Sequence, residues 1–289
     1  MVFHWRSIFL LCTLLFLSTL TGCMPGTQKS QPKQPSSPEH PQPSTYFSPK
    51  EREVANLPTL EGGPEYSIRK PHPVSNDLLQ RKYPDVFVLR APRNRNEVAL
   101  TFDDGPDQRF TPQVLDVLKK HRVKATFFLM GSRVKALPEV TRRIRDEGHV
   151  IGNHTYWHPN LPKESVERMD WEVRETEKSI QQATGDRPRF FRAPYGEMDE
   201  KRLRRLRDMG YYITGWSVDS LDWRQLPTEE IKHNVLSNTH PGSIILFHSG
   251  GHWTQDLSTM VEALDEIIPR LKADGIRFVT VPEMVKKGS

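Results

Sequence analysis

Cysteine is scarce in this sequence. Only two of its 289 residues are cysteines, Cys12 and Cys23, and both lie at the N-terminal end. The rest of the chain therefore has no thiol for a disulfide bond or for a thiolate metal ligand. Any metal site in that part of the chain must be built from histidine and carboxylate side chains.

Long apolar runs are also rare. One runs from about Ile8 to Leu20 behind the basic residue Arg6, and it is short for a membrane span. It leads into "LTGC" at 20–23, which resembles a bacterial lipobox. We therefore predict that residues 1–22 are a lipoprotein signal peptide and that Cys23 carries a lipid. The alternatives are an ordinary secreted protein or an uncleaved anchor.

Aliphatic residues are nearly absent from residues 23–50, which are rich in proline, serine and glutamine. Such a segment cannot bury a core, so we predict a disordered tether between the lipid anchor and a folded domain. Residues 51–95 are predicted to be an irregular lead-in with one strand at 85–89. The catalytic domain is expected at 96–285.

The chain lacks a strong excess of either charge, with 41 lysines and arginines against 36 aspartates and glutamates. Its most basic run, at 201–207, falls on a helix whose other face carries Leu203 and Leu206. This pattern favours a solvated basic face over a nucleic-acid-binding surface, so we expect no nucleic acid partner. The same face would suit an anionic cell-wall polymer.

What the sequence does contain is an alternation of strand-like and helix-like segments. The candidate strands are mostly continuous apolar runs, which are typical of strands buried on both faces. They lie at 97–102, 124–130, 149–154, 189–194, 211–219, 243–248 and 276–281. Helical patterns lie between them, with proline or glycine at their boundaries. The alternation predicts an α/β fold with about seven parallel strands, closed or nearly closed as a barrel.

Polar motifs follow five of these strands. They are the Asp103–Asp104 pair, "HTYWHP" at 154–159, "RAPYG" at 192–196, "DSLDW" at 219–223 and "HSG" at 248–250. The ends of parallel barrel strands meet at one rim, where the active sites of such barrels lie. We therefore expect these five motifs to form one site.

His154 and His158 are spaced i, i+4, which on a helical turn points both imidazoles the same way. With an aspartate from the same rim they would form a two-histidine, one-carboxylate site for zinc or a similar divalent ion. The second aspartate could then accept a proton from water. A metal ion and Arg192 would offset the repulsion between Asp103 and Asp104. The alternatives are a pair of surface histidines and a simple Asp-Asp-Gly-Pro turn.

The ordered set "TFDDGP", "HTYWH", "RAPYG", "DSLDW" and "ILFH" resembles the five motifs of the polysaccharide deacetylases. This family is also called carbohydrate esterase family four, or the NodB-homology domain. The resemblance implies a deformed (β/α) barrel that removes acetyl groups from polysaccharides with the help of a divalent metal. It also implies that Asp104, His154 and His158 bind the metal, that Asp103 is the general base and that Arg192 positions it.

The same resemblance implies that His248 is the general acid and that Asp222 pairs with it. The backbone N–H of Tyr195 would stabilise the oxyanion, and Trp223 and Leu246 would line the pocket for the acetyl methyl group. His252 is the nearby alternative for the acid. The role of Asp219 in the motif at 219–223 remains open, with a structural role within its strand as the alternative.

We therefore predict a membrane-tethered, extracytoplasmic, monomeric enzyme that removes N-acetyl groups from N-acetylglucosamine in a cell-wall polysaccharide. Peptidoglycan is the expected substrate, and zinc the expected metal, with cobalt or manganese as alternatives. Chitooligosaccharide or poly-N-acetylglucosamine deacetylation and xylan O-deacetylation remain open. A catalytically silent glycan-binding protein is the alternative of another class, but it would not need both Asp103 and His248.

Overall fold

The computed structural model describes residues 58–65 and 74–286. The predicted signal peptide, Cys23, the tether at 23–50 and residues 51–57 lie outside the described residues, so the interpretations of these segments remain predictions. Within the described ranges, no helix combines the length and the apolar character that crossing a bilayer requires.

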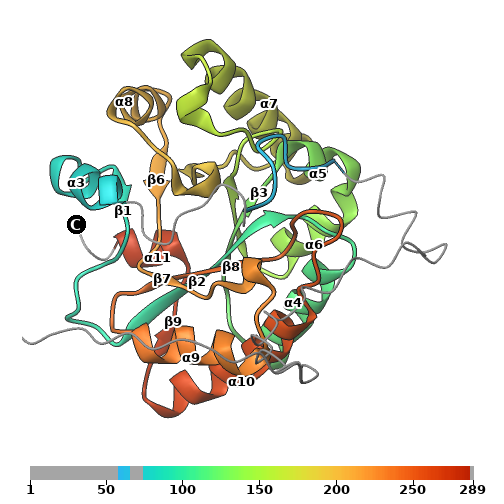
Figure 1. Cartoon of the computed structure of the whole chain (residues 1–289), viewed down its shortest axis with the longest axis vertical. Helices are drawn as coiled ribbons and strands as arrows, with labels where there is room; N and C mark the ends of the chain where they lie inside the picture. Colours follow the sequence, from blue (N-terminus) through green and yellow to red (C-terminus); the bar gives the residue numbers. More distant parts are fainter. Residues whose placement is uncertain (1–57, 66–73, 287–289) are drawn as a thin grey trace, which may run out of the picture. The chain divides into compact units, whose positions relative to one another are not determined.

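A nine-stranded parallel sheet forms the centre of the domain (Figure 1). The strand order is β1-β6-β5-β4-β3-β2-β8-β7, and β9 pairs with the start of β2. The strands are β1 (Phe87–Val88), β2 (Glu97–Gly105), β3 (Thr126–Leu129), β4 (Val150–Asn153), β5 (Phe190–Phe191), β6 (Tyr212–Thr214), β7 (Val218–Asp219), β8 (Ile244–His248) and β9 (Arg277–Phe278).

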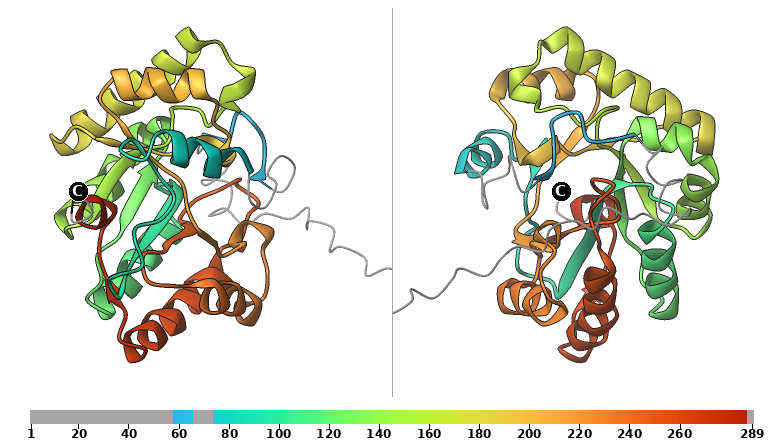
Figure 2. Two further views of the ribbon diagram at one scale, coloured as in Figure 1. Left: turned by 90° about the vertical axis from the view of Figure 1, so that its left-hand side faces the viewer. Right: turned by 45° about the vertical axis from the view of Figure 1, so that its right-hand side comes forward.

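Helices surround the curved sheet (Figure 2). They are α3 (Val74–Lys82), α4 (Phe110–Lys120), α5 (Gly131–Ala136), α6 (Pro138–Asp146), α7 (Val166–Thr184), α8 (Glu200–Asp208), α9 (Thr228–Asn238), α10 (Ser258–Ala273) and α11 (Val281–Lys286). Three 3₁₀ turns lie at η1 (Leu161–Lys163), η2 (Pro194–Gly196) and η3 (Asp222–Arg224). The boundaries follow local signals. The Ser165 side chain caps α7 by accepting from the Arg168 N–H, and Gly185 ends it with φ 83°.

Alternation along the strands separates two apolar layers. Val98, Leu100 and Phe102 of β2 pack in one cluster with residues of α4, α9 and α10, whereas Ala99 packs in another with Leu246 of β8. Successive side chains of a strand point to opposite faces, so Asp103 continues the face of Ala99. His248 continues the face of Leu246 in the same way. Both polar residues therefore end strands whose earlier residues fill the inside of the barrel.

The segment 211–219 was predicted as one strand, and this is wrong because the structure divides it into β6 and β7. β6 pairs with β5 and β1, while β7 pairs with β8 at the other end of the sheet. Gly215 lies at the crossing, where a Cβ would come within 2.3 Å of Leu89. The short link between β6 and β7 brings the two ends of the sheet together, and the predicted deformed barrel is confirmed.

The lead-in is more ordered than the sequence indicated. The strand predicted at 85–89 is present as β1, and it pairs in parallel with β6. It is preceded by α3, which was not predicted. The sheet therefore begins before residue 96, the predicted start of the catalytic domain.

Candidate active site

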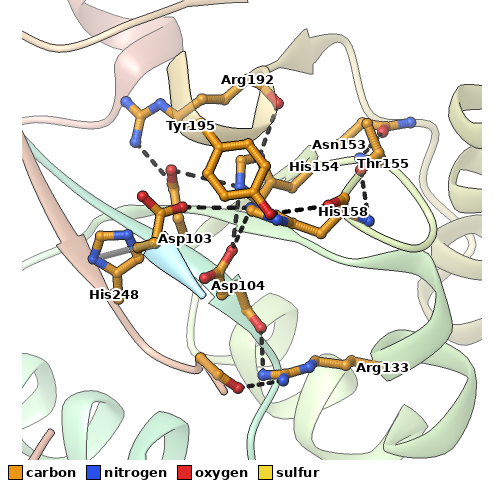
Figure 3. Close-up of polar contacts among 12 residues, drawn as sticks. Asp103, Asp104, Arg133, Asn153, His154, Thr155, His158, Arg192, Tyr195 and His248 are labelled. Atoms are coloured by element: carbon orange, nitrogen blue, oxygen red, sulfur yellow. Dashed lines mark hydrogen bonds and ion pairs between the residues drawn. The ribbon is translucent and has the colours of Figure 1, made fainter. Parts of the chain in front are cut away.

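Asp103 and Asp104 lie just before Gly105, the last residue of β2, and among the other predicted site residues (Figure 3). Asp103 pairs in register with His248 of the neighbouring β8. The ladder between β2 and β3 shifts register between Phe102 and Gly105, and Asp104 adopts φ 65°, which is uncommon for a residue other than glycine. This irregularity breaks the strand alternation, so two adjacent carboxylates both reach the site.

Arg192 offsets the charge of Asp103. Its Nη1 donates to Asp103 Oδ1 and to Thr101 Oγ1, both at 2.8 Å. Nε and Nη2 donate to the carbonyls of Thr214 and Gly215 at 3.1 and 2.8 Å. Because these acceptors surround the buried guanidinium, Arg192 is fixed in place and holds Asp103 in one orientation.

Asp104, His154 and His158 form a cluster with the features of a metal site. Asp104 Oδ1 lies 3.2 Å from the Nε2 atoms of both histidines. Both Asp104 oxygens and both His158 ring nitrogens are buried without a hydrogen-bond partner among the described residues. The Nδ1–H of His154 donates to the Arg192 carbonyl at 2.8 Å, which leaves its Nε2 lone pair for a metal.

The spacing of these atoms supports the same conclusion. Donors at about 2.0–2.2 Å from a tetrahedral ion lie about 3.3–3.6 Å from one another. The nitrogen–oxygen distances of 3.2 Å are close to this range. The three residues therefore fit a divalent ion, and two nitrogens with one oxygen are a set that zinc accepts.

His154 and His158 do not lie on the helical turn that their spacing suggested. They belong to a loop in which Thr155 and His158 have φ values of 66° and 60°. Side chains stabilise this shape, because Asn153 Oδ1 accepts from the Thr155 N–H at 3.0 Å and Thr155 Oγ1 accepts from the His158 N–H at 3.1 Å. The two imidazoles still meet, with ring centroids 4.9 Å apart.

Two buried charged residues that the sequence did not single out support this region. Glu172 of α7 accepts from the backbone N–H groups of Tyr156 and Trp157 at 2.7 and 2.8 Å, which fixes the histidine loop. Arg133 of α5 donates from Nη1 to the carbonyl of Asp104 at 2.9 Å. Glu172 therefore fixes the loop between the two histidines, and Arg133 fixes the backbone of Asp104.

His248 and Asp222 form a buried pair. The Nδ1–H of His248 donates to Asp222 Oδ1, and its backbone N–H donates to Asp222 Oδ2, both at 2.7 Å. Burial alone would lower the pKa of His248, but the Asp222 charge and hydrogen bond, with smaller effects of Asp104 and Glu65, raise it to about 10. His248 is therefore protonated at neutral pH, with Nε2 free of the Asp222 contact. His252, the alternative acid, is half-buried and bonds to Thr254 instead.

The residues predicted to bind substrate lie at different depths. Tyr195, in η2 with φ 60°, stacks edge-on against His158 with ring centroids 4.5 Å apart. Leu246 lies inside the barrel, two residues before His248, and Trp223 is buried in η3. The oxyanion and acetyl-pocket roles of these residues remain predictions. Asp219 accepts from the Leu221 N–H at 3.0 Å, which fits the structural alternative.

Glu65 was not predicted at the site. It lies in the lead-in, and its Oε1 is 3.6 Å from His158 Nε2. Glu65, Asp104 and His248 also form a second group whose potential ligand atoms lie within 4.8 Å of one another. The site thus contains a buried carboxylate from outside the five motifs.

Comparisons with known proteins agree with this geometry. The sequence profile of the polysaccharide deacetylase family matches residues 90–214. A peptidoglycan-N-acetylglucosamine deacetylase of Bacillus cereus is 49% identical over 200 residues, which cover 68% of this chain and 71% of that protein. A peptidoglycan-N-acetylmuramic acid deacetylase of Bacillus subtilis is 35% identical over 214 residues, covering 73% and 78%.

A solved structure is similar over nearly its whole length. It is a peptidoglycan N-acetylglucosamine deacetylase in complex with 4-naphthalen-1-yl-N-oxidanyl-benzamide. Its TM-score is 0.69 at 47% identity, and the match covers 73% of this chain and 96% of that chain. This chain is therefore similar to that deacetylase in both its fold and its sequence.

Proposed function

This chain belongs to the polysaccharide deacetylase family, and we propose that it removes the N-acetyl group from N-acetylglucosamine residues of peptidoglycan with the help of a divalent metal ion. One observation carries the proposal. The Asp104, His154 and His158 cluster lies beside both a carboxylate held by an arginine and a histidine paired with an aspartate. A binding module would have no use for an acid and a base on the same cluster.

Amide hydrolysis needs an activated water, a stabilised oxyanion and a protonated leaving nitrogen. A divalent ion at the three ligands would polarise the acetyl carbonyl and lower the pKa of a nearby water. Asp103 accepts a proton from this water as the water oxygen bonds to the carbonyl carbon. Arg192 orients Asp103 for this step through the hydrogen bond between Nη1 and Oδ1.

The leaving group departs on the other side of the site. His248 Nε2 donates its proton to the amide nitrogen while the carbon–nitrogen bond breaks, which yields acetate and a free amine. Asp222 holds His248 protonated and oriented before the step. The Tyr195 N–H is the protein group that we assign to the oxyanion.

N-acetylglucosamine is proposed over N-acetylmuramic acid because the relatives with the former activity are the more similar ones, at 49% and 47% identity against 35%. Zinc is the proposed metal, since its preferred ligands include histidine nitrogen and aspartate oxygen. A lipid on Cys23 would hold the enzyme at the outer face of the membrane, within reach of the wall. We also propose that the enzyme acts as a monomer.

Acetate release tests the proposal. The purified protein is stripped of metal, reloaded with zinc and given peptidoglycan or chitooligosaccharides. We expect zinc-dependent acetate release that Asp103→Asn lowers by about 10²–10⁴-fold, because the general base is lost. Asp146→Asn, which changes an exposed carboxylate paired with Arg145, is the matched control and should leave the rate unchanged. The absence of acetate from both polymers, with zinc bound and the protein folded, would contradict the proposal.

A further inference from the structure

Two of the groups that would hold the metal, and the group that would protonate the leaving nitrogen, are closed off in this structure. Asp104, His158 and His248 are each at most 2% exposed. An acetyl group carried on a polysaccharide cannot reach side chains in this position unless part of the chain moves away. Segments that close over enzyme sites in this way are commonly loops rather than sheet strands.

The segment that lies against the site is Pro58–Glu65, which we call the N-terminal strap (blue in Figures 1 and 2). The Glu61 N–H donates to the Trp157 carbonyl at 2.7 Å, and the Gly62 N–H donates to the His158 carbonyl at 3.0 Å. The strap therefore pairs through its backbone with the loop that carries a metal ligand.

The strap also lies close to Tyr195. The Tyr195 hydroxyl donates to the Gly63 carbonyl at 2.8 Å. A Cβ added to Gly62 would come within 2.4 Å of Tyr195 Oη and 2.9 Å of the His158 carbonyl oxygen. Only glycine allows the backbone to approach the site this closely, so the closed position depends on this residue.

At its end the strap places Glu65 between the metal ligands and the general acid. Its Oε1 is 3.6 Å from His158 Nε2, and its carboxylate shares a group within 4.8 Å with Asp104 and His248. The side chain is buried at 4% exposure. A carboxylate in this place has the chemistry of acetate, the product released between the same groups.

We propose that Glu65 is a built-in competitor of the substrate, which occupies the acetyl position of the closed site and must leave with the strap before a polysaccharide binds. This inference rests on the proposed deacetylase function. The closed and open forms are two states of one segment, and substrate binds only the open one. The apparent substrate affinity is therefore reduced by the fraction of open protein.

The contacts of the strap are consistent with such an exchange. Besides its backbone hydrogen bonds, it is held by the Tyr195 hydroxyl, by Arg133 Nε, which donates to the Pro58 carbonyl at 3.1 Å, and by the burial of Leu60. The ion pair between Glu61 and Arg168, whose side chains are 47% and 36% exposed, contributes little. Burying the Glu65 charge is unfavourable unless positive charge lies nearby. Protonated His248 lies near Glu65, and a divalent ion at Asp104, His154 and His158 would add further positive charge, so metal binding would favour the closed strap.

The test measures binding of acetohydroxamate, a small metal-chelating analogue of acetate, to the zinc-loaded full chain by calorimetry. Glu65→Gln keeps the shape of the side chain and removes its charge. If the open form is about 1–10% of the protein, acetohydroxamate should bind about ten- to hundred-fold more tightly to the variant. The KM for chitooligosaccharide should fall by the same factor, and kcat should stay within about twofold because Glu65 takes no part in the reaction.

Two further variants separate the strap from the carboxylate. Gly62→Ala moves the strap away from Tyr195 without changing Glu65, so it should tighten acetohydroxamate binding in the same direction. Glu61→Gln makes the same chemical change on the strap, but the Glu61 side chain pairs with Arg168 on the surface. It should therefore change the affinity for acetohydroxamate by less than about threefold.

Three results would overturn the inference. One is unchanged acetohydroxamate affinity and KM in both Glu65→Gln and Gly62→Ala. The second is a loss of kcat at constant KM in Glu65→Gln, which would make Glu65 part of the reaction. The third is a loss of zinc from Glu65→Gln, which would make Glu65 a required ligand. Acetohydroxamate binding needs no turnover, so it tests the strap even if no glycan releases acetate. A failure to release acetate would contradict the proposed function but not the role of the strap.

Discussion

Replacing Asp222 with asparagine should move the alkaline limit of activity to lower pH. In the parent protein His248 has a pKa of about 10 against its ordinary 6.5, and both Asp222 oxygens bind it at 2.7 Å. Asp222→Asn keeps the shape but removes the charge. Burial then acts with little opposition, and the pKa of His248 should fall to its ordinary value or below.

The magnitude follows from the protonated fraction of His248. A general acid must be protonated, so the rate declines as pH rises through its pKa. At pH 8 a histidine of pKa 10 is almost fully protonated, whereas one of pKa 6.5 is about 3% protonated, so the variant should lose about 30-fold in kcat/KM. At pH 6 most of this loss should disappear.

The assay is acetate release from chitooligosaccharide between pH 5.5 and 10, with zinc held constant. Asp219→Asn is the matched control, because Asp219 is a nearby aspartate that accepts from the Leu221 N–H and its loss should not move the alkaline limb. If the alkaline limb of Asp222→Asn coincides with that of the parent, His248 is not the acid that limits the rate. The raised pKa also stabilises the folded state below about pH 6.5, and this contribution is lost as pH rises through about 10.

Three further predictions concern the metal, the buried arginine and the anchor. Zinc added to the metal-free protein at about 100 times its dissociation constant should stabilise the fold by about 2.7 kcal/mol and raise Tm by about 5–10 °C in a thermal melt. Equal Tm values with and without zinc would exclude a specific site. In Arg192→Lys the lysine cannot reach the four acceptors of the guanidinium, so denaturant unfolding should show that the free energy of unfolding falls by about 3–5 kcal/mol. A decrease below about 1 kcal/mol would contradict a stabilising buried ion pair between Arg192 and Asp103. Cys23→Ser should move the protein from the membrane to the soluble fraction after cell lysis, and retention in the membrane would contradict the lipid anchor.

The framework of the barrel could be predicted because its central strands are buried on both sides. β2 and β8 read as continuous apolar runs ended by polar residues, and the structure places both inside the sheet. Helix α7 could be predicted from its length and from Gly185, which follows its last residue. By contrast, α9 buries only Ile231 and Val235, so its apolar pattern is too weak to indicate a helix.

What could not be predicted depends on tertiary partners. The residues of 211–219 suit one strand, and only the positions of β1, β5 and β8 divide it at Gly215. The i, i+4 spacing of His154 and His158 fits a helix, but the loop is fixed by Asn153 and Glu172. The only sequence signal for the contact between Glu172 and the loop is that a glutamate stands among the buried positions of α7.

Glu65 had no sequence signal at all. It stands in "EGGPEY", where glycine and proline indicate a turn. Nothing in this stretch indicates contact with residues as distant in the sequence as His248. A carboxylate placed by tertiary structure alone can be recognised only from the structure.

The charges of the site explain how two adjacent aspartates are tolerated. Asp103 is matched by Arg192, and Asp222 is matched by protonated His248. The Asp104 carboxylate lies against the imidazoles of His154 and His158, which are neutral when they bind a metal. Asp104 therefore keeps one negative charge, and the closed strap adds a second from Glu65.

This balance predicts how the product inhibits the enzyme. A divalent ion neutralises the closed site but leaves the open site with one positive charge, which favours both the oxyanion of hydrolysis and the acetate product. Acetate must compete with Glu65 in the parent protein but not in Glu65→Gln, so its inhibition constant should fall in the variant by the same factor as KM. The measurement is the inhibition of deacetylation by added sodium acetate, with sodium chloride as the ionic-strength control. Equal acetate inhibition of parent and variant would show that Glu65 does not occupy the acetate position.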